Sequence, residues 1–517
     1  MDSLLTGLSV AVAPQNLLYV LIGVLIGMVI GVLPGLGSTA TVALLLPVTY
    51  GMEPTSAIIM LAGIYYGSMY GGTITSVLLQ LPGEAASVVT TFDGYQMAKQ
   101  GRAGSALGIA AVGSFIGGTL AVVGLTLFAS PLAQVAVKFG PPEYTMLTVL
   151  GILLVSYLGT RSLPKSLAAA GFGFVLAAIG QDPITGEARL SFGVLELLGG
   201  LDFVAVAMGL FGIGEVLYNL ERSEAGQRIV TRVRRAWISR DDWRASRGAI
   251  ARGSVVGFLL GVLPGGGGVV ASMASYVLEK RRAKQPERFG RGAIEGVAGP
   301  ETANNAASTS SFIPLLTLGL PSNAVLALLF GALLLQGITP GPQLINEQPD
   351  VFWGVIASMY VGNLLLLLLN MPLVGVFVQM LRLRAGILGP IAVLVTMAGV
   401  YSVNNSIFDI GVAVAFGVLG YLMRKTGFEA GPLVLAFVLG PIMERSFRQS
   451  LLLSDGSLTI FVSRPLSGAI VAVVLGMVAL SVVRGVRRRR AGASASPSET
   501  TSAGGATDVI EKDDAHV

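Results

Sequence analysis

Few residues of this 517-residue chain could do chemistry inside its apolar segments. Cysteine is absent and the one histidine is His516, so the apolar segments contain no thiolate nucleophile, disulfide or histidine ligand. A Ser/Lys or paired-aspartate motif does not stand out either, which favours a protein that is not an enzyme. Among the acids, Glu84 and Glu301 are the candidates for binding a coupling ion, because an ionisable group at membrane depth usually has a function. Glu301 follows Pro300 and therefore also fits the first turn of a helix at the membrane surface.

A pentapeptide that breaks helices occurs twice. Gly-Val-Leu-Pro-Gly fills residues 31–35 and again 261–265, each time inside an apolar stretch and followed by more glycine. Proline and glycine are costly inside a bilayer unless the backbone groups that they free line a cavity or are covered by protein. Two breaks at matching positions of two halves are the best sequence indication of a transporter binding site.

A second repeated element follows each pentapeptide. Residues 65–76 and 299–311 are rich in hydroxyl, amide and small side chains, and Leu-Pro follows each, at 81–82 and 320–321. A helix that breaks and restarts offers unpaired N–H groups and a partial positive charge at its new N-terminus. This arrangement suits a carboxylate or phosphate without any arginine. Close helix packing is the alternative explanation for any single small residue here.

The two repeated elements together predict a site for an anionic substrate. Its backbone N–H groups, close-approach glycines and side-chain donors are expected from Gly35, Gly37, Ser38, Thr39, Gly71, Gly72, Thr73, Gly266, Gly267, Gly268, Asn304, Asn305, Ser308, Thr309, Pro321 and Ser322. Unwound carbonyl groups near Gly35 and Gly265 could in addition hold Na⁺. Apart from a coupling ion, Na⁺ or H⁺, we predict no cofactor.

The composition is that of an integral membrane protein. Hydrophobic residues make up 53% of the chain and charged residues 12%, with a mean hydropathy of +0.74. Many apolar runs are long enough to cross a bilayer as helices, and strand-type alternation is absent. Expected spans lie at 105–129, 143–158, 166–181, 199–219, 352–380, 385–403, 405–423, 428–443 and 465–483.

Positive charge assigns the cytoplasmic side. The segment 222–252 contains nine arginines against three acids, and the segment 280–291 contains six Lys or Arg, so both are expected in the cytoplasm. The stretch 253–279 between them is too short for two spans. We therefore predict a re-entrant hairpin with arms of about 12 residues and its tip at 264–268. The stretch 15–49 has no basic flanks and is predicted as a second hairpin, open to the outside, although 15–33 could also span alone.

The resulting fold class is an all-α polytopic membrane protein with about 10–12 transmembrane helices in two inverted-topology repeats, with re-entrant hairpins and broken helices. The first repeat is 1–221, a basic cytoplasmic loop is 222–252, the second repeat is 253–485, and 486–517 is a disordered cytoplasmic tail. The C-terminus is expected in the cytoplasm and the N-terminus outside.

These motifs resemble the large membrane subunit of the tripartite tricarboxylate transporters, the TctA family. The resemblance rests on G-V-L-P-G-L-G at 31–37, Y-G-S-M-Y-G-G-T-I-T-S-V-L-L-Q-L-P-G-E at 66–84, G-V-L-P-G-G-G at 261–267 and G-P-E-T-A-N-N-A at 299–306. It implies a permease of the bacterial cell membrane that works with a small membrane subunit and a periplasmic solute-binding protein. Such systems import tricarboxylates such as citrate, or related organic anions, on an ion gradient.

Alternative functions stay open at this point. A carboxylate transporter that works without a binding protein would have the same composition, and so would an anion channel with the Pro-Gly tips as its filter. The net charge of +5 does not indicate a nucleic-acid partner, because the basic residues cluster in loops between spans. The response of carboxylate uptake to an imposed ion gradient separates these functions.

Overall fold

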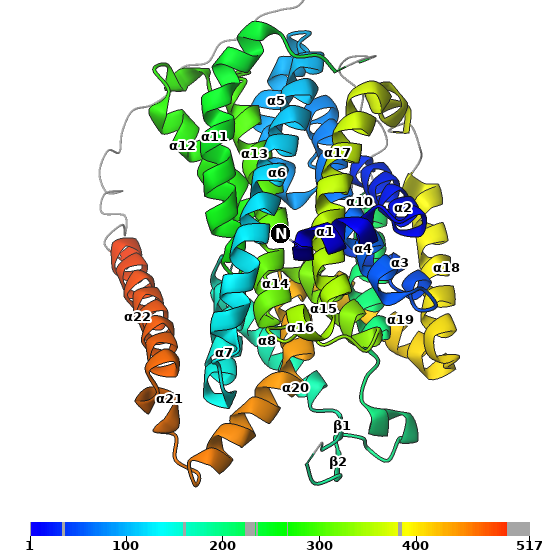
Figure 1. Ribbon diagram of the computed structural model, residues 1–517, viewed down its shortest axis with the longest axis vertical. Coiled ribbons are helices and arrows are strands. Elements are labelled where there is room, and N and C mark those ends of the chain that lie inside the picture. Colours follow the sequence, from blue (N-terminus) through cyan, green and yellow to red (C-terminus); the bar gives the residue numbers. More distant parts are fainter. Residues whose placement is uncertain are drawn as a thin grey trace, which may run out of the picture.

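The protein is almost entirely helical. The computed structural model (Figure 1) describes residues 2–33, 37–158, 162–182, 184–222, 233, 236–265, 267–380 and 385–493. The β-structure of this described part is one antiparallel hairpin, in which β1 (Gly180–Gln181) pairs with β2 (Ala188–Arg189). This confirms the predicted all-α class.

The first half of the chain extends from α1 to α10. Its helices are α1 (Asp2–Ala11), α2 (Pro14–Val32), α3 (Ser38–Leu45), α4 (Pro54–Leu79), α5 (Thr90–Lys99), α6 (Ala103–Ala136), α7 (Pro141–Leu158), α8 (Leu163–Ala177), α9 (Phe203–Ala207) and α10 (Gly214–Arg222). Short 3-10 turns are η1 (Pro47–Thr49), η2 (Ala85–Val88) and η3 (Leu195–Gly199), and η4 (Met208–Ile213) is a π-helical stretch that joins α9 to α10.

The second half extends from α11 to α22. Its helices are α11 (Arg240–Val262), α12 (Gly268–Arg282), α13 (Glu295–Ser310), α14 (Phe312–Leu318), α15 (Ala324–Leu335), α16 (Leu344–Glu347), α17 (Pro349–Met380), α18 (Ala385–Asn404), α19 (Ile407–Lys425), α20 (Ala430–Leu453), α21 (Ile460–Ser463) and α22 (Pro465–Ala493). One 3-10 turn, η5 (Pro286–Arg288), precedes α13.

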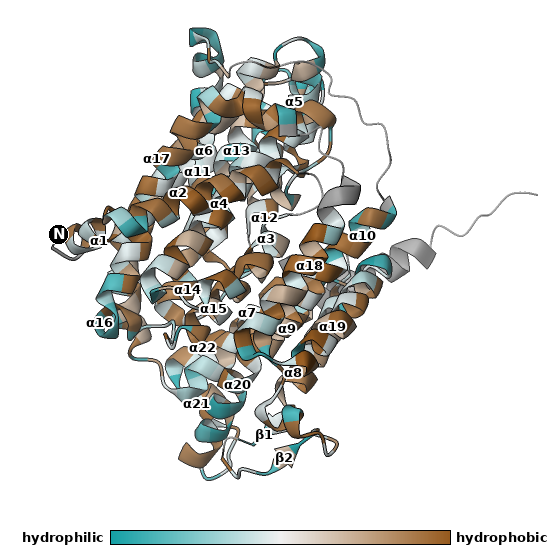
Figure 2. Ribbon diagram, turned by 90° about the vertical axis from the view of Figure 1, so that its right-hand side faces the viewer, coloured by the Kyte–Doolittle hydropathy of each residue, from teal (hydrophilic) through white to brown (hydrophobic). Residues whose placement is uncertain are grey.

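Long apolar helices dominate the molecule. Within the described residues, seven helical stretches are long and apolar enough to cross a membrane, namely α2, α4, α6, the run 203–221, most of α17, α19 and α20. Shorter apolar helices of 10–17 residues occur in α8, α15, α18 and α22. Figure 2 shows hydrophobic segments along the middle of the body and hydrophilic ones mainly toward its two ends. The chain is thus a multi-pass membrane protein, as predicted.

Both halves contain the same series of elements. Each has a helical hairpin, α2–α3 or α11–α12, followed by a broken element. In the first half this element is α4, an interruption at 80–84 and α5, and in the second half it is α13 and α14, an interruption at 319–323 and α15. The first hairpin arm packs along the broken element in both cases, α2 on α4 and α11 on α13. The helix breaks therefore occur at the two Leu-Pro sequences, as predicted.

Glycines at every fourth position set the register of this packing. They are Gly23, Gly27 and Gly31 in α2, and Gly253, Gly257 and Gly261 in α11. A Cβ on Gly27 would overlap the backbone of Ile64 in α4, and a Cβ on Gly257 would overlap the backbone of Ala303 in α13. The offset between these two glycines is 230 and that between their partners is 239, which are the offsets of the repeated sequence motifs. The sequence repeat is therefore also a repeat of backbone packing.

The two halves are joined because helices of each half pack on helices of the other half. Helix α6 of the first half packs on α11 and α13, and α17 of the second half packs on α2 and α4. Other helices also pack across the two halves: the run α9–α10 of the first half lies on α18 and α19, and α20 of the second half lies on α7 and α8. As a result the broken elements are enclosed: α4 is buried from Thr55 to Leu78 and α13 from Gly296 to Ser310. This enclosure satisfies the requirement that broken helices be covered by protein.

Part of the segment 222–252, predicted as a loop, is helical. Helix α11 begins at Arg240, because Ser239 and Asp242 form a reciprocal cap. Ser239 Oγ accepts the Asp242 N–H at 3.0 Å, and Asp242 Oδ2 accepts the Ser239 N–H at 3.2 Å. In the hairpin of the second half, the first arm, α11, therefore has 23 residues and the second arm, α12, has 15, and both are longer than predicted.

Two further differences lie at the ends of the chain. Helix α22 continues to Ala493, so residues 486–493 are helical and do not belong to a disordered tail. Arginine is a good helix former, and its run at 487–490 extends the apolar helix without a break. Residues 494–517 lie outside the described part. Helix α1, which the sequence analysis omits, packs on α17.

We expect Gly27→Ala and Gly257→Ala to destabilise the protein. Even a methyl group would overlap the facing backbone, and overpacking of this kind costs about 1–3 kcal/mol. The matched control is Gly151→Ala in α7, where a Cβ would meet no atom within 4 Å. The thermal unfolding midpoint in detergent should fall for the first two variants and stay unchanged for the third. Equal midpoints in all three would contradict the packing role of these glycines.

Candidate functional site

The hairpin tips of both halves have the same backbone geometry. The second arm of each hairpin follows a glycine N-cap, Gly37 before α3 and Gly267 before α12. Their φ and ψ angles are 34° and 165° for Gly37, and 21° and 174° for Gly267, a conformation that favours glycine. Among the described residues, a Cβ on Gly267 would meet no atom within 4 Å, and one on Gly37 would meet only Glu84 Oε1, at 3.8 Å. Both helix N-termini therefore have open space beside them.

In the first half, a carboxylate of the protein binds this N-terminus. Ser38, the first residue of α3, donates its backbone N–H to Glu84 Oε1. Glu84 stands at the restart after the Leu-Pro break, where it forms a reciprocal cap of η2 with Ser87. A helix N-terminus favours an anion through its unpaired N–H groups and its dipole. Glu84 therefore acts as an internal ligand of the α3 N-terminus.

In the second half, the equivalent N-terminus faces a neutral amide. Asn304 of α13 lies so close to Gly268, the first residue of α12, that a Cβ on this glycine would overlap Asn304 Oδ1. The Asn304 side chain is fully buried, yet neither its Oδ1 nor its Nδ2 has a hydrogen-bond partner among the described residues. Buried polar groups are nearly always paired, and an unpaired one costs about 1–3 kcal/mol. The Asn304 amide and the α12 N-terminus are thus two neighbouring polar groups, and the amide has no hydrogen-bond partner among the described residues.

The two hairpin tips lie close to each other's broken elements. A Cβ on Gly268 would lie 3.1 Å from the Cβ of Ala86, which is two residues after Glu84. Helix α12 packs on η2, and α3 packs in the same manner on α15. Each hairpin tip of one half therefore contacts the helix restart of the other half.

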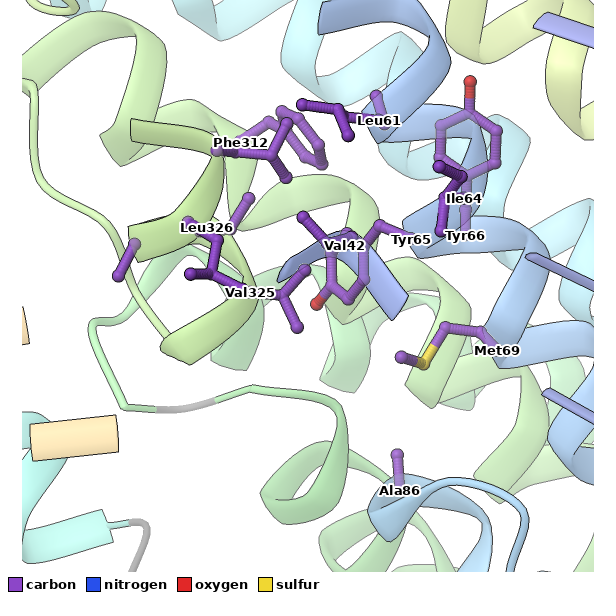
Figure 3. Packing of buried hydrophobic residues seen from close by; sticks show 14 of the residues in the cluster. Val42, Leu61, Ile64, Tyr65, Tyr66, Met69, Ala86, Phe312, Val325 and Leu326 are labelled. Atoms are coloured by element: carbon purple, nitrogen blue, oxygen red, sulfur yellow. The ribbon is translucent and has the colours of Figure 1, made fainter. Parts of the chain in front are cut away.

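Tyr65 connects the two broken elements. Asn323 has the position in the second half that Glu84 has in the first, and its Oδ1 caps α15. Its Nδ2 donates to the Tyr65 hydroxyl at 3.2 Å. Figure 3 shows Tyr65 in the surrounding apolar cluster together with Val325 of α15. The restart of the first half is thus capped by an acid and that of the second half by a neutral amide.

Glu301 lies in a polar network that crosses between the halves. Its Oε2 accepts a hydrogen bond from Thr73 of α4 at 2.7 Å, and its Oε1 accepts one from Thr90 of α5. Its carbonyl oxygen accepts from Asn305 Nδ2 at 3.1 Å and from Ser114 of α6 at 3.4 Å. All of these residues are buried. Within the described residues, no ion pair includes the Glu301 carboxylate.

The position of Glu301 decides between its two sequence interpretations. Helix α13 begins at Glu295, and Pro300 lies inside it. Glu301 is 1% exposed. The interpretation of Glu301 as a cap in the first helical turn is therefore wrong, and its interpretation as a deeply buried acid remains.

Several other predicted residues contact this region. Ser308 Oγ donates to the Asn304 carbonyl at 2.9 Å, and Ser322, next to Pro321 in the second interruption, accepts the Gly265 N–H with its carbonyl at 2.8 Å. Asn305 Nδ2 also donates to Ser114 Oγ at 2.7 Å. A possible Na⁺ site at the carbonyl groups near Gly265 stays a prediction.

The remaining predicted residues lie in three different surroundings. Gly71 packs its backbone against Met28 and Gly31 of α2, and Gly72 packs against the backbone of Glu84, so close packing explains both glycines. Thr39 is partly exposed near the start of α3, and Thr309 is buried near the end of α13. Gly35 and Gly266 lie outside the described residues.

Some residues of the site are absent from the predicted set. They are Tyr65, Ala86, Thr90, Ser114 and Asn323. Tyr65 and Asn323 stand inside the repeated elements. At the offset of 239, Tyr65 corresponds to Asn304 and Asn323 corresponds to Glu84, and this correspondence could have identified them from the sequence. Thr90 and Ser114 belong to no motif, and only the packing of α5 and α6 on α13 brings them to Glu301.

A separate cavity of about 330 Å³ lies between α8, α15 and α20. Its lining is mainly apolar, with residues such as Leu176, Leu335 and Phe437, and includes none of the predicted site residues. Such a lining does not suit an anion, because it offers few polar groups to orient a charge.

The architecture and the site define the class of this protein. Two matched halves, each with a helical hairpin and a broken helix around buried polar groups, agree with the plan of many transporter folds. The family model described as "Tripartite tricarboxylate transporter TctA family" matches residues 17–435. The chain belongs to this transporter family, as the sequence motifs predict.

Two proteins of Agrobacterium vitis are similar to this chain. The "uncharacterized 52.8 kDa protein in TAR-I ttuC' 3'region" is 48% identical over 489 residues, which cover 95% of this chain and 97% of that protein. The "uncharacterized protein in TAR-II ttuC' 3'region" is 51% identical over 234 residues, which cover 45% of this chain and 97% of that protein. No solved structure matches the chain.

We expect Glu84→Ala to destabilise the protein more than Glu84→Gln does. Alanine removes the acceptor for the α3 N-terminus and the cap of η2, whereas glutamine keeps an acceptor oxygen. A hydrogen bond to a charged group contributes about 1.5–3 kcal/mol, so the thermal unfolding midpoint in detergent should fall clearly for alanine and less for glutamine. Glu347→Ala, at an exposed position of α16, serves as the control. An unchanged midpoint for Glu84→Ala would exclude the capping role.

Proposed function

We propose that the chain is the permease subunit of a binding-protein-dependent transporter that imports tricarboxylates such as citrate, or related organic anions, on an ion gradient. It resides in a bacterial cell membrane with its C-terminus in the cytoplasm and its N-terminus outside. Its partners are a small membrane subunit and an extracytoplasmic solute-binding protein. Family membership supports the partners, and the arginine-rich segment 222–252 supports the orientation.

One observation carries this proposal: the unpartnered Asn304 amide beside the N-terminus of α12. The first turn of α12 offers backbone N–H groups that have no partner within the helix, together with the positive end of the helix dipole. Gly267 leaves the approach to these groups open. The Asn304 amide can donate to one oxygen of a carboxylate while the helix end binds the other. This combination recognises an organic anion without arginine.

The substrate binds in one half only. The N-terminus of α3 is already bound by Glu84, whereas that of α12 faces the neutral Asn304. The Glu84 carboxyl group already occupies the N-terminus of α3, which leaves the N–H groups of the second tip for an external anion.

An inverted relation of the two halves would allow transport by alternating access. In Figure 1, α5 lies toward the top of the molecule and α15 in its lower part, so the restart helices of the two halves extend from the shared centre in opposite directions. Hairpins of opposite orientation can expose one central site first to one side of the membrane and then to the other.

The transport function is tested by uptake of ¹⁴C-citrate into membrane vesicles that contain the chain and both partner proteins. An imposed Na⁺ or H⁺ gradient should drive accumulation above the external concentration, and an ionophore that collapses the gradient should abolish it. Uptake that ignores both gradients would favour a channel. Absence of uptake and of exchange for citrate, malate and succinate would exclude the proposed substrate class.

We expect Asn304→Ala and Gly267→Leu to abolish uptake while the protein stays in the membrane at the wild-type level. Alanine removes the unpartnered amide, and leucine at Gly267 would fill the open approach to α12 and strain the backbone there. The matched controls are Asn346→Ala in α16 and Gly411→Leu in α19, which lie away from the site. Near-normal uptake by both site variants would contradict substrate binding at Asn304 and the α12 N-terminus.

A further inference from the structure

Glu301 is a buried acid without a counter-charge. Its side chain is 1% exposed, and within the described residues its carboxylate contacts only the hydroxyl groups of Thr73 and Thr90 as polar partners. An ionised carboxylate in such surroundings is strongly unfavourable unless a proton or a cation neutralises it. The hydrogen-bond geometry distinguishes between these two.

The geometry suits a protonated carboxylic acid. Thr73 Oγ1 lies 2.7 Å from Glu301 Oε2 and 3.5 Å from the carbonyl oxygen of Met69. A proton on Oε2 would reverse the bond that Thr73 donates to this oxygen: Glu301 would donate to Thr73 Oγ1, Thr73 would turn its hydrogen toward the Met69 carbonyl, and Thr90 would still donate to Oε1. Every polar hydrogen of the group then has an acceptor. A sodium ion would instead need several oxygen ligands arranged around one point, and the two threonines contact different oxygens of the carboxylate.

The following titratable groups, from elements packed around α13, have partners other than Glu301, and the Tyr66 ring of α4 lies against Gly362. Arg252 of α11 forms an ion pair with Glu279 of α12. Asp93 of α5 accepts a hydrogen bond from the Tyr276 hydroxyl of α12. Tyr70 of α4 donates to Asn363, and Glu84 before η2 binds the α3 N-terminus. Helices α6 and α14 have no acidic, basic or tyrosine residue in their sequences. No described side chain therefore neutralises Glu301, which leaves a proton or an external cation, and the hydrogen-bond geometry favours the proton.

Glu301 also links the proton to the substrate. It lies three residues before Asn304 on α13, so the two side chains are one helical turn apart. Thr73 and Thr90 belong to the first half, whereas Glu301 and Asn304 belong to the second. Ionisation of Glu301 would leave a charge between the two halves and oppose their contact. Protonation removes this charge and allows the contact again.

We propose that Glu301 is the proton-binding residue that couples this transporter to a proton gradient. It takes up one proton on the outer side together with the substrate and releases that proton on the inner side. This inference rests on the proposed transport function and names its coupling ion.

Infrared spectroscopy on the purified full-length protein in detergent tests the proton directly and needs no substrate. The wild type should show a C=O stretching band of a protonated carboxylic acid that disappears as the pH is raised. Glu301→Gln should lack this band, and Glu295→Gln, an acid at the start of the same helix, should keep it. Replacing KCl with NaCl at equal ionic strength should leave the band unchanged. A band that persists in Glu301→Gln, or that Na⁺ but not K⁺ removes from the wild type, would overturn the proposal.

Transport by the assembled system tests the coupling. In vesicles at zero membrane potential, one-to-one coupling should let the wild type accumulate ¹⁴C-citrate about tenfold for each pH unit of gradient. Glu301→Gln, which mimics the protonated form, should keep citrate exchange but reach only equal concentrations on both sides. Accumulation at the wild-type level by Glu301→Gln, or loss of exchange as well, would overturn the coupling role. A wild type that neither accumulates nor exchanges citrate would count against the transport function, and the infrared result would still stand.

Discussion

Direct contact between helix backbones is the constraint on which the rest of this structure depends. Glycines at every fourth position of α2 and α11 bring these helices against α4 and α13 so closely that a methyl group would overlap the facing backbone. In a membrane, where lipid offers helices no hydrophobic advantage for association, small residues of this kind provide the packing contacts. The glycines hold each hairpin in register with a broken element, and this register fixes where the hairpin tip meets the helix break.

The two halves have the same packing but different side chains at their hairpin tips. Two helix N-termini with the same backbone geometry face the centre, and one is bound by the Glu84 carboxylate while the other faces the neutral Asn304 amide. A helix end attracts an anion in either case. The two halves therefore differ in this one respect, an internal acid in the first and, among the described residues, an amide without a hydrogen-bond partner in the second, and on this difference the proposed site for one external anion rests.

Exchange of helices between the halves determines the surroundings of Glu301. Helix α6 of the first half covers α13, and the broken element of the first half supplies the two threonines that bind the carboxylate. The acid thus lies on the contact between the halves, where a change of its charge acts on both. A residue within one half would have no such effect on their relative position.

The sequence by itself determined the helical class, the positions of the long apolar helices and the breaks at the Pro-Gly and Leu-Pro motifs, because helix length, hydropathy and backbone breaking are local properties. It also identified Asn304, Glu84 and Glu301 as polar groups in apolar surroundings. The tertiary structure alone decided that Glu84 binds the α3 N-terminus, that the Asn304 side chain has no hydrogen-bond partner among the described residues, and that Thr90 and Ser114 reach Glu301. These outcomes depend on which helix faces which across long sequence separations, and a pattern of neighbouring residues carries no information on such contacts.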